Sequence, residues 1–351
     1  MAIGRIISGQ SLSEAEESFN VSLRPKSLDE CIGQQNVREK LGIAIAAAKQ
    51  RGEPLEHILF YGPPGLGKTT LANVVANEMD ARIRCSSGPA LIKAGDVMGL
   101  LTNISTGDVL FIDEIHRLST VVEEFIYPAM EDFRVDYTVD SGLHAKTINF
   151  PLKQFTLVGA TTRAGLLSAP LRSRFGLLYH LDFYSTDELT EILSRSAQLL
   201  KLECQENTLE RIAARSRGTP RVANRLLKRV RDYAQVKGSG VLSTDIVDNA
   251  LKMEQIDSLG LDELDRSFLR ALATVYDGGP AGIEAIAATL GEERDTLEDV
   301  VEPYLLQIGF VRRTKRGREI TQPACKHLGL TIHRTKKTKA DETPLFDIEQ
   351  A

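Results

Sequence analysis

Hydrophobic residues in the first half of the chain follow two patterns, one typical of helices and one of buried strands. Val37, Leu41, Ile45 and Ala48 recur at helical spacing, which predicts an amphipathic helix over residues 36–51. Short apolar runs between polar stretches predict buried strands at residues 57–61, 108–113, 155–160 and 177–183. Because helical stretches alternate with these runs, the pattern predicts an α/β domain whose parallel sheet is covered by helices on both faces.

The pattern changes in the second half of the chain. Residues 186–253 have helical periodicity throughout, which predicts a small all-α domain. From residue 257, helical segments precede two β-like segments around Lys315, Arg316 and Gly317, and helices followed by a basic hairpin are typical of a winged helix. We therefore expect an α/β domain at residues 1–184, which begins with a loose arm at 1–20. An all-α domain at 185–256, a winged helix at 257–335 and a disordered tail at 336–351 should follow.

Composition narrows the classes of protein. A chain of 351 residues suits two or three domains, and a hydrophobic content of 42% excludes disorder over most of it. The absence of Trp argues against an aromatic platform for single-stranded nucleic acid. No apolar run approaches the roughly 18 residues that a membrane span needs, and residues 1–20 lack the pattern of a secretory signal. We therefore expect a cytosolic protein without membrane contact.

Cysteine spacing and charge distribution add further limits. The four cysteines form no C-x-x-C pair and the six histidines do not cluster, which argues against a structural metal site but not against nucleotide-borne Mg²⁺. The net charge of −5 disfavours a chain that coats nucleic acid everywhere. However, residues 257–309 carry 12 acidic and 3 basic residues, whereas residues 310–339 carry 10 basic and 1 acidic. Such a basic segment suits phosphate backbones, although a solvated tail explains the charge equally well.

A glycine-rich loop directly after the first predicted strand carries the strongest chemical signal. Residues 62–69 read GPPGLGKT, which fits the phosphate-loop pattern G-x-x-x-x-G-K-[ST]. Glycines let backbone N–H groups close around phosphate oxygens, and the following helix adds the positive end of its dipole. We expect Lys68 to reach the β- and γ-phosphates of ATP and the Thr69 hydroxyl to ligate Mg²⁺. A chance glycine-rich turn is disfavoured because the loop lies between a predicted strand and a predicted helix.

Polar residues that end the other predicted strands are candidates for hydrolysis. Asp113 and Glu114 follow an apolar run, and the carboxyl ends of parallel strands border the crevice where ligands bind. We expect Asp113 to hold Mg²⁺ through water and Glu114 to orient or deprotonate the attacking water. The alternative is a carboxylate pair that merely opens a loop. Thr161 follows the next apolar run and is a weaker candidate for contact with the γ-phosphate.

Two arginines are candidates for stabilising transition-state charge. Arg174, within LRSRF, would act as an arginine finger if it lay against the γ-phosphate of a neighbouring subunit. Spacing alone instead favours a surface arginine paired with a carboxylate. Arg221 begins a predicted helix and is placed to reach back to the nucleotide from the helical domain. The other cations of that helix are expected to form a solvated face: Arg225, Lys228 and Arg229.

Several segments of the chain carry motifs in a fixed order: GPPGLGKT, LFIDEIHR, GATTRAG, PLRSRFG and GTPRVANRLLKRVRDYA. Together they resemble the AAA+ ATPase family and, more narrowly, the RuvB-type motors that drive branch migration of Holliday junctions. The resemblance covers about residues 23–329, and GATTRAG with the C-terminal RTKRGR is specific to that group. It implies an ATP-dependent DNA translocase of recombination and repair that works as a homohexameric ring on the duplex arms of four-way junctions.

The resemblance also implies roles for residues at matching positions. The positions for phosphate, magnesium, Walker B aspartate, catalytic glutamate and γ-phosphate sensor fall, in that order, on Lys68, Thr69, Asp113, Glu114 and Thr161. Arg174 matches the finger donated to the adjacent subunit, and Arg221 the second sensor on the lid. The other implied nucleotide contacts are Leu23, Arg24, Gly65, Gly67, Thr70, Glu131, Asp132, Phe133 and Tyr184.

Two further segments match parts of the family that meet its partners. Residues 133–150 match a variable hairpin that in relatives docks on RuvA, the junction-recognition protein, so Leu143 and Ile148 are candidate contacts; an ordinary surface hairpin is the alternative. Arg294, Arg313 and Arg318 match arginines that touch the DNA backbone in relatives, and phosphate contacts position a protein without reading sequence. A RuvC-type resolvase is a further implied partner.

Other classes of function remain as alternatives. A clamp-loader-like or origin-binding AAA+ ATPase, in which ATP binding is a switch, would also suit a basic winged helix. The hairpin at 133–150 and the lack of zinc-ligand cysteines argue against that alternative. A non-catalytic DNA-binding regulator has no need of Glu114 or Arg174. A protein-unfolding ring is disfavoured because residues 90–107 contain no aromatic-glycine pore loop.

Overall fold

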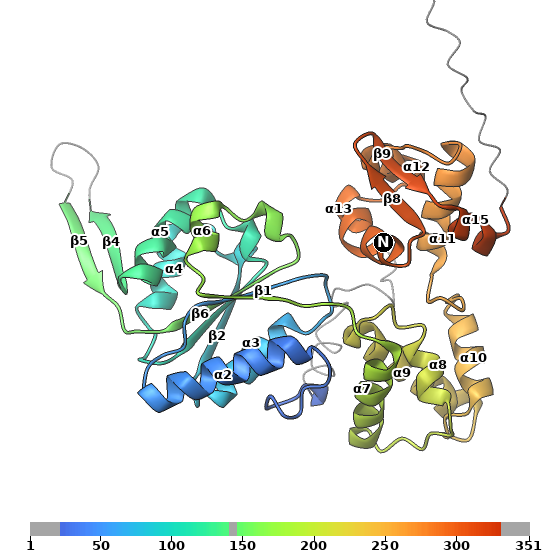
Figure 1. Ribbon diagram of the computed structural model, residues 1–351, viewed down its shortest axis with the longest axis horizontal. Coiled ribbons are helices and arrows are strands. Elements are labelled where there is room, and N and C mark those ends of the chain that lie inside the picture. Colours follow the sequence, from blue (N-terminus) through green and yellow to red (C-terminus); the bar gives the residue numbers. More distant parts are fainter. Residues whose placement is uncertain (1–21, 140–145, 331–351) are drawn as a thin grey trace, which may run out of the picture. The chain divides into compact units, whose positions relative to one another are not determined.

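The computed structural model describes residues 22–139 and 146–330, which fall into two compact units divided after Asp262 (Figure 1). Each unit is described by itself. The predicted arm at 1–20 and the predicted tail at 336–351 lie outside the described residues, as does Leu143.

The N-terminal unit is built on a five-stranded sheet with the order β2-β3-β6-β1-β7, in which every neighbouring pair is parallel. The predicted α/β fold is therefore confirmed. Its strands are β1 (Ile58–Tyr61), β2 (Ile83–Ser87), β3 (Val109–Asp113), β6 (Thr156–Thr161) and β7 (Leu177–His180). Pattern analysis missed β2, because its sequence IRCSS is only partly buried and has no apolar run.

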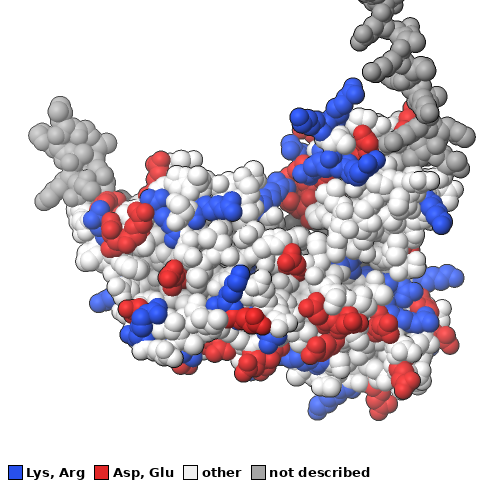
Figure 2. All heavy atoms as spheres, in the orientation of Figure 1, with Lys and Arg blue, Asp and Glu red and all other residues white. Residues whose placement is uncertain are grey.

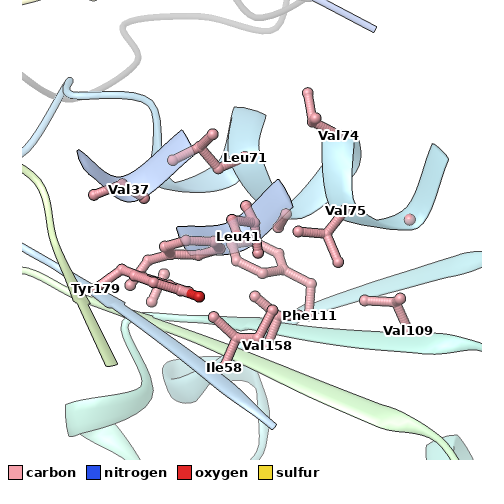
Figure 3. Close-up of a cluster of buried hydrophobic side chains, with 14 of the residues drawn as sticks. Val37, Leu41, Ile58, Leu71, Val74, Val75, Val109, Phe111, Val158 and Tyr179 are labelled. Carbon is pink, nitrogen blue, oxygen red and sulfur yellow. The ribbon is translucent and has the colours of Figure 1, made fainter. Parts of the chain in front are cut away.

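Two helices cover one face of this sheet. They are α2 (Gln35–Arg51) and α3 (Lys68–Glu78). Val37 and Leu41 of α2 pack with Leu71 and Val75 of α3 against side chains such as Phe111 of the central strands (Figure 3). The spacing that predicted α2 therefore selects its buried face.

Helices on the opposite face enclose a second core that includes Leu110, Ile112 and Leu157 of the sheet. They are α4 (Ala94–Leu101), α5 (Thr120–Glu131) and α6 (Ala169–Ser173), with short helices at Gly88–Ala90, Ile115–Arg117 and Ala164–Leu166. His57, just before β1, links β6 to α5. Its Nδ1 accepts from Leu157 N–H at 2.9 Å, and its Nε2 lies 3.0 Å from the Met130 carbonyl. Burial lowers the pKa of His57, so the neutral ring that makes both bonds is favoured.

A hairpin of β4 (Arg134–Val139) and β5 (Lys146–Pro151) projects from the body of the N-terminal unit (Figure 1). It follows α5, and Val135 at its base is buried in the second core. The antiparallel pairing agrees with the hairpin expected in the segment 133–150.

The rest of the N-terminal unit is helical, as predicted. Its helices are α7 (Thr186–Leu199), α8 (Thr208–Ala213), α9 (Pro220–Lys237) and α10 (Thr244–Met253). Ser185 begins α7 with a capping box, since its side chain accepts from Glu188 N–H and the Glu188 carboxylate accepts from Ser185 N–H. Leu193, Leu226 and Val247, from three of these helices, share one buried core.

The C-terminal unit has the helices and basic hairpin of a winged helix. The helices are α11 (Glu263–Arg270), α12 (Ile283–Leu290), α13 (Arg294–Thr296), α14 (Glu302–Gln307) and α15 (Gln322–Leu328), with π-helical turns at Ala271–Val275 and Leu297–Val301. The hairpin, called the wing below, pairs β8 (Val311–Thr314) with β9 (Gly317–Ile320). An isolated bridge from Ala281 to Arg318 extends the wing by one short antiparallel contact.

Candidate nucleotide-binding site

The phosphate loop joins β1 to the N-terminus of α3. Gly65 and Gly67 adopt φ values of 82° and 102°, a conformation that favours glycine. Lys68 is only 7% exposed, and its ammonium donates to the carbonyl oxygens of Gly62 and Pro63, both at 2.8 Å. The loop therefore holds the lysine inside its own curve, next to the N–H groups that begin α3.

Burial lowers the pKa of Lys68 to about 8. The nearby Asp113 carboxylate opposes this change, whereas the positive charge of Arg221 adds to it. An anionic ligand in the loop would restore the charged form, because the opposite charge favours ionisation.

Oxygen ligands suited to a magnesium ion meet between the phosphate loop and β3. The Thr69 hydroxyl lies 3.4 Å from Asp113 Oδ2, and Asp113 Oδ1 accepts from Glu114 N–H at 2.9 Å. A hydroxyl and a carboxylate are the hard oxygen ligands that Mg²⁺ prefers. The described residues present no cluster of three or more His, Cys, Asp or Glu side chains suited to a protein-held metal. These two residues therefore suit a metal that also takes ligands from phosphate and water.

Glu114 directly follows β3 in a left-handed conformation, with φ at 48°. Its carboxylate pairs with Arg117 at 3.0 Å, and both side chains are well exposed. Gly88 packs against the backbone here so closely that a Cβ at residue 88 would overlap the Glu114 carbonyl oxygen. Gly88 therefore fixes the path of the chain at the candidate catalytic residue.

Thr161 ends β6, the strand between β1 and β3. Its hydroxyl lies 2.9 Å from His116 Nδ1 and accepts from Arg163 N–H at 3.0 Å. Its carbonyl accepts from Gly62 N–H at 3.2 Å, at the start of the phosphate loop. Sequence reasoning missed His116, whose position two residues after Glu114 was the available signal. The pair links the end of β6 to the turn that carries Glu114.

Two of the residues implied on the base side of the nucleotide, Tyr184 and Arg221, lie where the lid meets the phosphate loop. The Tyr184 hydroxyl donates to the Leu66 carbonyl at 3.2 Å, and Arg221 N–H approaches the Gly65 carbonyl at 3.4 Å. Leu23 is buried, and its carbonyl accepts from Arg195 of α7 at 2.9 Å. Arg24 is half-buried, and its charge opposes the rise that burial causes in the pKa of Cys85.

A second group of candidates gathers at the C-terminal ends of α5 and α6, on the sheet face opposite α3. Arg174 Nη2 contacts Glu131 at 3.2 Å, so the carboxylate pairing expected from spacing is present. Asp132 pairs with Arg134 at 3.2 Å. The Phe133 ring packs edge-on to Phe155 with centroids 5.9 Å apart. Within one chain, this group is therefore separated from the phosphate loop by the sheet.

The prediction that three cations of α9 form a solvated face is wrong for Arg225. Arg225 is 3% exposed, whereas Lys228 is half-buried and Arg229 is exposed. One helical turn separates Arg225 from the buried Val222, so its side chain shares the face that packs into the lid core. Counting cations along the helix did not distinguish the two faces.

The three arginines expected to meet DNA converge on two carboxylates of the C-terminal unit. Arg318 donates to Glu302 at 2.9 Å and to Glu298 at 3.1 Å, and Arg313 donates to Glu302 at 2.5 Å. Arg294 pairs with Glu298 at 3.4 Å. Glu302 is 0% exposed; burial alone would raise its pKa, but hydrogen bonds from Arg318 and Arg313 outweigh burial and lower it.

The arginines differ in how much they present to solvent. The Arg318 side chain is 12% exposed, whereas that of Arg313 is 55% exposed. On the face drawn in Figure 2, Lys and Arg side chains gather over the wing. In the part of the chain that the structure describes, no ion pair holds three other exposed cations of the wing: Arg312, Lys315 and Arg316. Sequence reasoning did not single out Glu298 and Glu302, although the acidic run that contains them was visible.

A phosphate loop at the edge of a parallel sheet, strand-end carboxylates, a helical lid and a winged helix define an AAA+ ATPase with a DNA-binding module. Three family models match successive segments: the Holliday junction DNA helicase RuvB P-loop domain at residues 23–181, the RuvB AAA lid domain at 184–257, and the RuvB C-terminal winged helix domain at 258–329. The chain belongs to the RuvB family of ATP-hydrolysing Holliday junction helicases.

Solved structures of RuvB from Thermotoga maritima agree with this assignment. One, described as a Holliday junction branch migration motor, is 53% identical with a TM-score of 0.81, and the match covers 89% of this chain and 99% of that one. Two mutant forms of the same protein, also 53% identical, have TM-scores of 0.83 and 0.82, with 88% of this chain and 99% of theirs covered. Among the described residues, no helix combines the length and apolar character needed to cross a membrane.

Proposed function

We propose that this chain uses ATP hydrolysis to move duplex DNA through a four-way junction, as a homohexameric ring that works with a RuvA-type junction-binding protein. A RuvC-type resolvase would act on the same junction. The proposal rests on side chains that meet at one edge of the sheet: Lys68, Thr69, Asp113 and Thr161. Glu114 directly follows Asp113 in the chain. This set can bind a triphosphate and activate water, which suits a motor better than a passive DNA binder.

The roles of the individual residues follow from their positions. Lys68 and the N–H groups of Gly65, Gly67 and the start of α3, which includes Thr70, would bind the phosphates. Thr69 and Asp113 would hold Mg²⁺, which neutralises charge on the β- and γ-oxygens when it is bound. Glu114 would accept the proton of the attacking water or orient that water. Thr161, held by His116, would contact the γ-phosphate.

Residues of two chains would complete each site in the ring. Arg221 and Tyr184 contact the phosphate loop of their own chain and would bind the nucleotide there, together with Leu23 and Arg24. Arg174, with Glu131, Asp132 and Phe133, lies on the other face of the sheet and would meet the nucleotide of the adjacent chain. An arginine placed in this way stabilises charge in the transition state of phosphoryl transfer.

The wing and the β4–β5 hairpin would meet the partners. Arg294 and Arg313 expose part of their side chains and would contact phosphates, with Arg318 beneath them. On the hairpin, Ile148 and Phe150 are each 37% exposed and lie on one strand at alternate positions. Exposed apolar side chains on a projecting hairpin suit a protein contact, so we assign them to the RuvA-type partner.

A synthetic four-way junction tests the proposal directly. Branch migration would be followed with ATP and Mg²⁺, with and without a RuvA-type protein, and Lys68→Ala would serve as the control. We expect migration that requires ATP, is stimulated by the partner and is lost in the variant. Duplex-stimulated ATP hydrolysis without junction movement in either condition would instead favour the clamp-loader or origin-switch alternative.

Glu114→Gln separates nucleotide binding from hydrolysis. The amide keeps the size of the side chain but cannot accept the proton of water, so we expect ATP affinity close to that of the unmodified protein and a fall in kcat of roughly 10²–10⁴. Binding of a fluorescent ATP analogue and steady-state phosphate release measure the two properties. Unchanged turnover would remove Glu114 from the catalytic role.

A further inference from the structure

The guanidinium of Arg174 is held by contacts with α5 and α6. Its Nη1 donates to the Pro170 carbonyl at 2.7 Å, and its Nη2 contacts Glu131 at 3.2 Å. Its central carbon lies above the ring of Tyr127, 4.2 Å from the centroid. A cation this close to the face of an aromatic ring is attracted by the negative charge density of that face. The ring therefore supports one face of the guanidinium.

Tyr127 is itself fixed by a buried carboxylate. Its hydroxyl donates to Glu123 Oε2 at 3.0 Å, and the Ser168 hydroxyl donates to the same oxygen at 2.6 Å. Glu123 is only 7% exposed. Ser168 also caps α6 by accepting from Leu171 N–H at 3.2 Å. One carboxylate of α5 thus fixes both the edge of the Tyr127 ring and the start of the helix that leads to Arg174.

The three contacting residues of α5 are spaced four apart: Glu123, Tyr127 and Glu131. Residues at this spacing lie on one helix face, one turn above another. The first holds the start of α6 through Ser168, and the other two hold Arg174 at its end. Since α6 is only five residues long, these contacts hold both of its ends, while Leu171 packs its middle into the second core.

We propose that Tyr127, anchored by Glu123, is the positioning residue of the arginine finger. The inference rests on the proposed role of Arg174 at the nucleotide of the adjacent chain. The ring sets the plane of the guanidinium, and the hydrogen bond from the hydroxyl to Glu123 holds the tip of the ring in place. Glu131 neutralises the guanidinium until the γ-phosphate replaces it, because both are anions that bind the same donors.

The environment of Arg174 Nε supports the assignment of the guanidinium plane to the Tyr127 ring. It is buried and has no hydrogen-bond partner among the described residues, so the hydrogen bonds of Arg174 do not fix its whole guanidinium. The contact with the ring supplies the missing constraint on the plane. The ring constrains the plane without taking up an N–H donor, so displacement of Glu131 alone would free Nη2 for an incoming phosphate.

Kinetics of three variants test the positioning role. We expect Tyr127→Leu to lower kcat by about 3- to 30-fold, the range that a contact of this kind supports, with the KM for ATP unchanged. Tyr127→Phe keeps the ring face but loses the bond to Glu123, so it should recover only part of the loss. Phe125→Leu, a partly buried aromatic residue on the same helix, is the matched control and should leave kcat unchanged. Full activity in Tyr127→Leu would overturn the proposal.

Mixed rings separate a positioning role from general damage. Lys68→Ala chains cannot bind ATP but present an intact finger to the adjacent chain. When mixed with Tyr127→Leu chains, they should restore ATP turnover at the sites of those chains. They should do the same when mixed with Arg174→Ala chains. Rescue of Arg174→Ala without rescue of Tyr127→Leu would place the Tyr127 defect in its own nucleotide site and overturn the proposal. Failure to rescue Arg174→Ala would remove the finger from the adjacent site, and the positioning role with it.

Discussion

At the scale of single residues, the buried ammonium of Lys68 makes nucleotide affinity depend on pH. Burial lowers the pKa of Lys68 to about 8, so above that pH its amine is neutral in the free protein. The amine must then take up a proton before it can bind the phosphates of ATP as a cation. We expect affinity for a fluorescent ATP analogue to be constant below about pH 8 and to fall by up to about tenfold per pH unit above it.

The matched variant for this prediction is Lys68→Arg. A guanidinium stays charged over the whole pH range. We therefore expect the variant to bind ATP more weakly than the parent but without this loss of affinity above about pH 8. Equal dependence on pH in both proteins would attribute the effect to another group.

Single residues also show what the sequence could and could not predict about the site. Lys68, Asp113 and Thr161 were predicted to meet because each follows a parallel strand, and the carboxyl ends of such strands share an edge. His116 and Glu302 were not singled out, because their contacts depend on which segments approach in three dimensions. Arg225 was assigned wrongly to the solvent, because local charge does not reveal which face of a helix is buried.

At the scale of elements, the short helix Gly88–Ala90 controls the turn that carries Glu114. A methyl group at residue 88 would overlap the Glu114 carbonyl, which is backbone and cannot rotate away. We expect Gly88→Ala to shift this turn and lower kcat at least tenfold while ATP binding changes little, since the phosphate loop is untouched. Steady-state ATP hydrolysis and ATP-analogue binding check this.

Gly95→Ala provides the control for the substitution at Gly88. Nothing lies within 4 Å of its added Cβ, and it occupies an exposed position in α4, where alanine favours the helix by roughly 0.5–1 kcal/mol. Activity should be retained in that variant. Equal activity of the two alanine variants would show that the turn tolerates displacement.

The wing is a second element whose position depends on a buried group. Glu302 accepts from both Arg313 and Arg318, so Glu302→Gln leaves two guanidinium groups without their shared charge. Loss of one partner of a fully buried pair costs about 3–5 kcal/mol, and the loss here should be smaller because Arg313 is exposed and Arg318 keeps Glu298. We expect the C-terminal unit of the full chain to unfold at a lower temperature and duplex DNA to bind more weakly. Calorimetry and fluorescence anisotropy measure the two effects.

Glu284→Gln tests whether burial is the cause. Glu284 also pairs with an arginine, Arg294, but its side chain is 78% exposed. Exposed pairs contribute little to stability, so this variant should unfold like the parent. If both variants lost the same stability, the wing would not depend on the buried carboxylate.

Elements also differ in how well the sequence predicts them. The apolar runs predicted β1, β3, β6 and β7, because strands in a covered parallel sheet are apolar on both faces. β2 lies at the edge of the sheet, where partial burial permits Arg84 and two serines, so it has no such run. The predicted β7 was too long, since the strand ends at His180 and the chain then turns toward the lid.

At the scale of the whole molecule, charge is divided between the parts of the chain. The net charge is −5, yet residues 310–339 carry 10 basic residues and 1 acidic residue. In the C-terminal unit, the acidic side chains Glu298 and Glu302 lie beneath the wing arginines and neutralise part of that charge. Within the described residues, no ion pair holds three of the wing cations, Arg312, Lys315 and Arg316. Binding of duplex DNA should therefore be dominated by phosphate contacts that ignore base sequence.

Salt dependence tests this division of charge. Each phosphate contact lowers the slope of log affinity against log salt by about 0.9, so loss of one contact should make the slope shallower by about 1. We expect this from Lys315→Ala and from Arg316→Ala on duplexes of any sequence, measured by anisotropy over a range of NaCl concentrations. Lys237→Ala, an exposed cation at the end of α9, should keep the parent slope. If Lys237→Ala changed the slope as much as the wing variants, binding would follow overall charge rather than the wing.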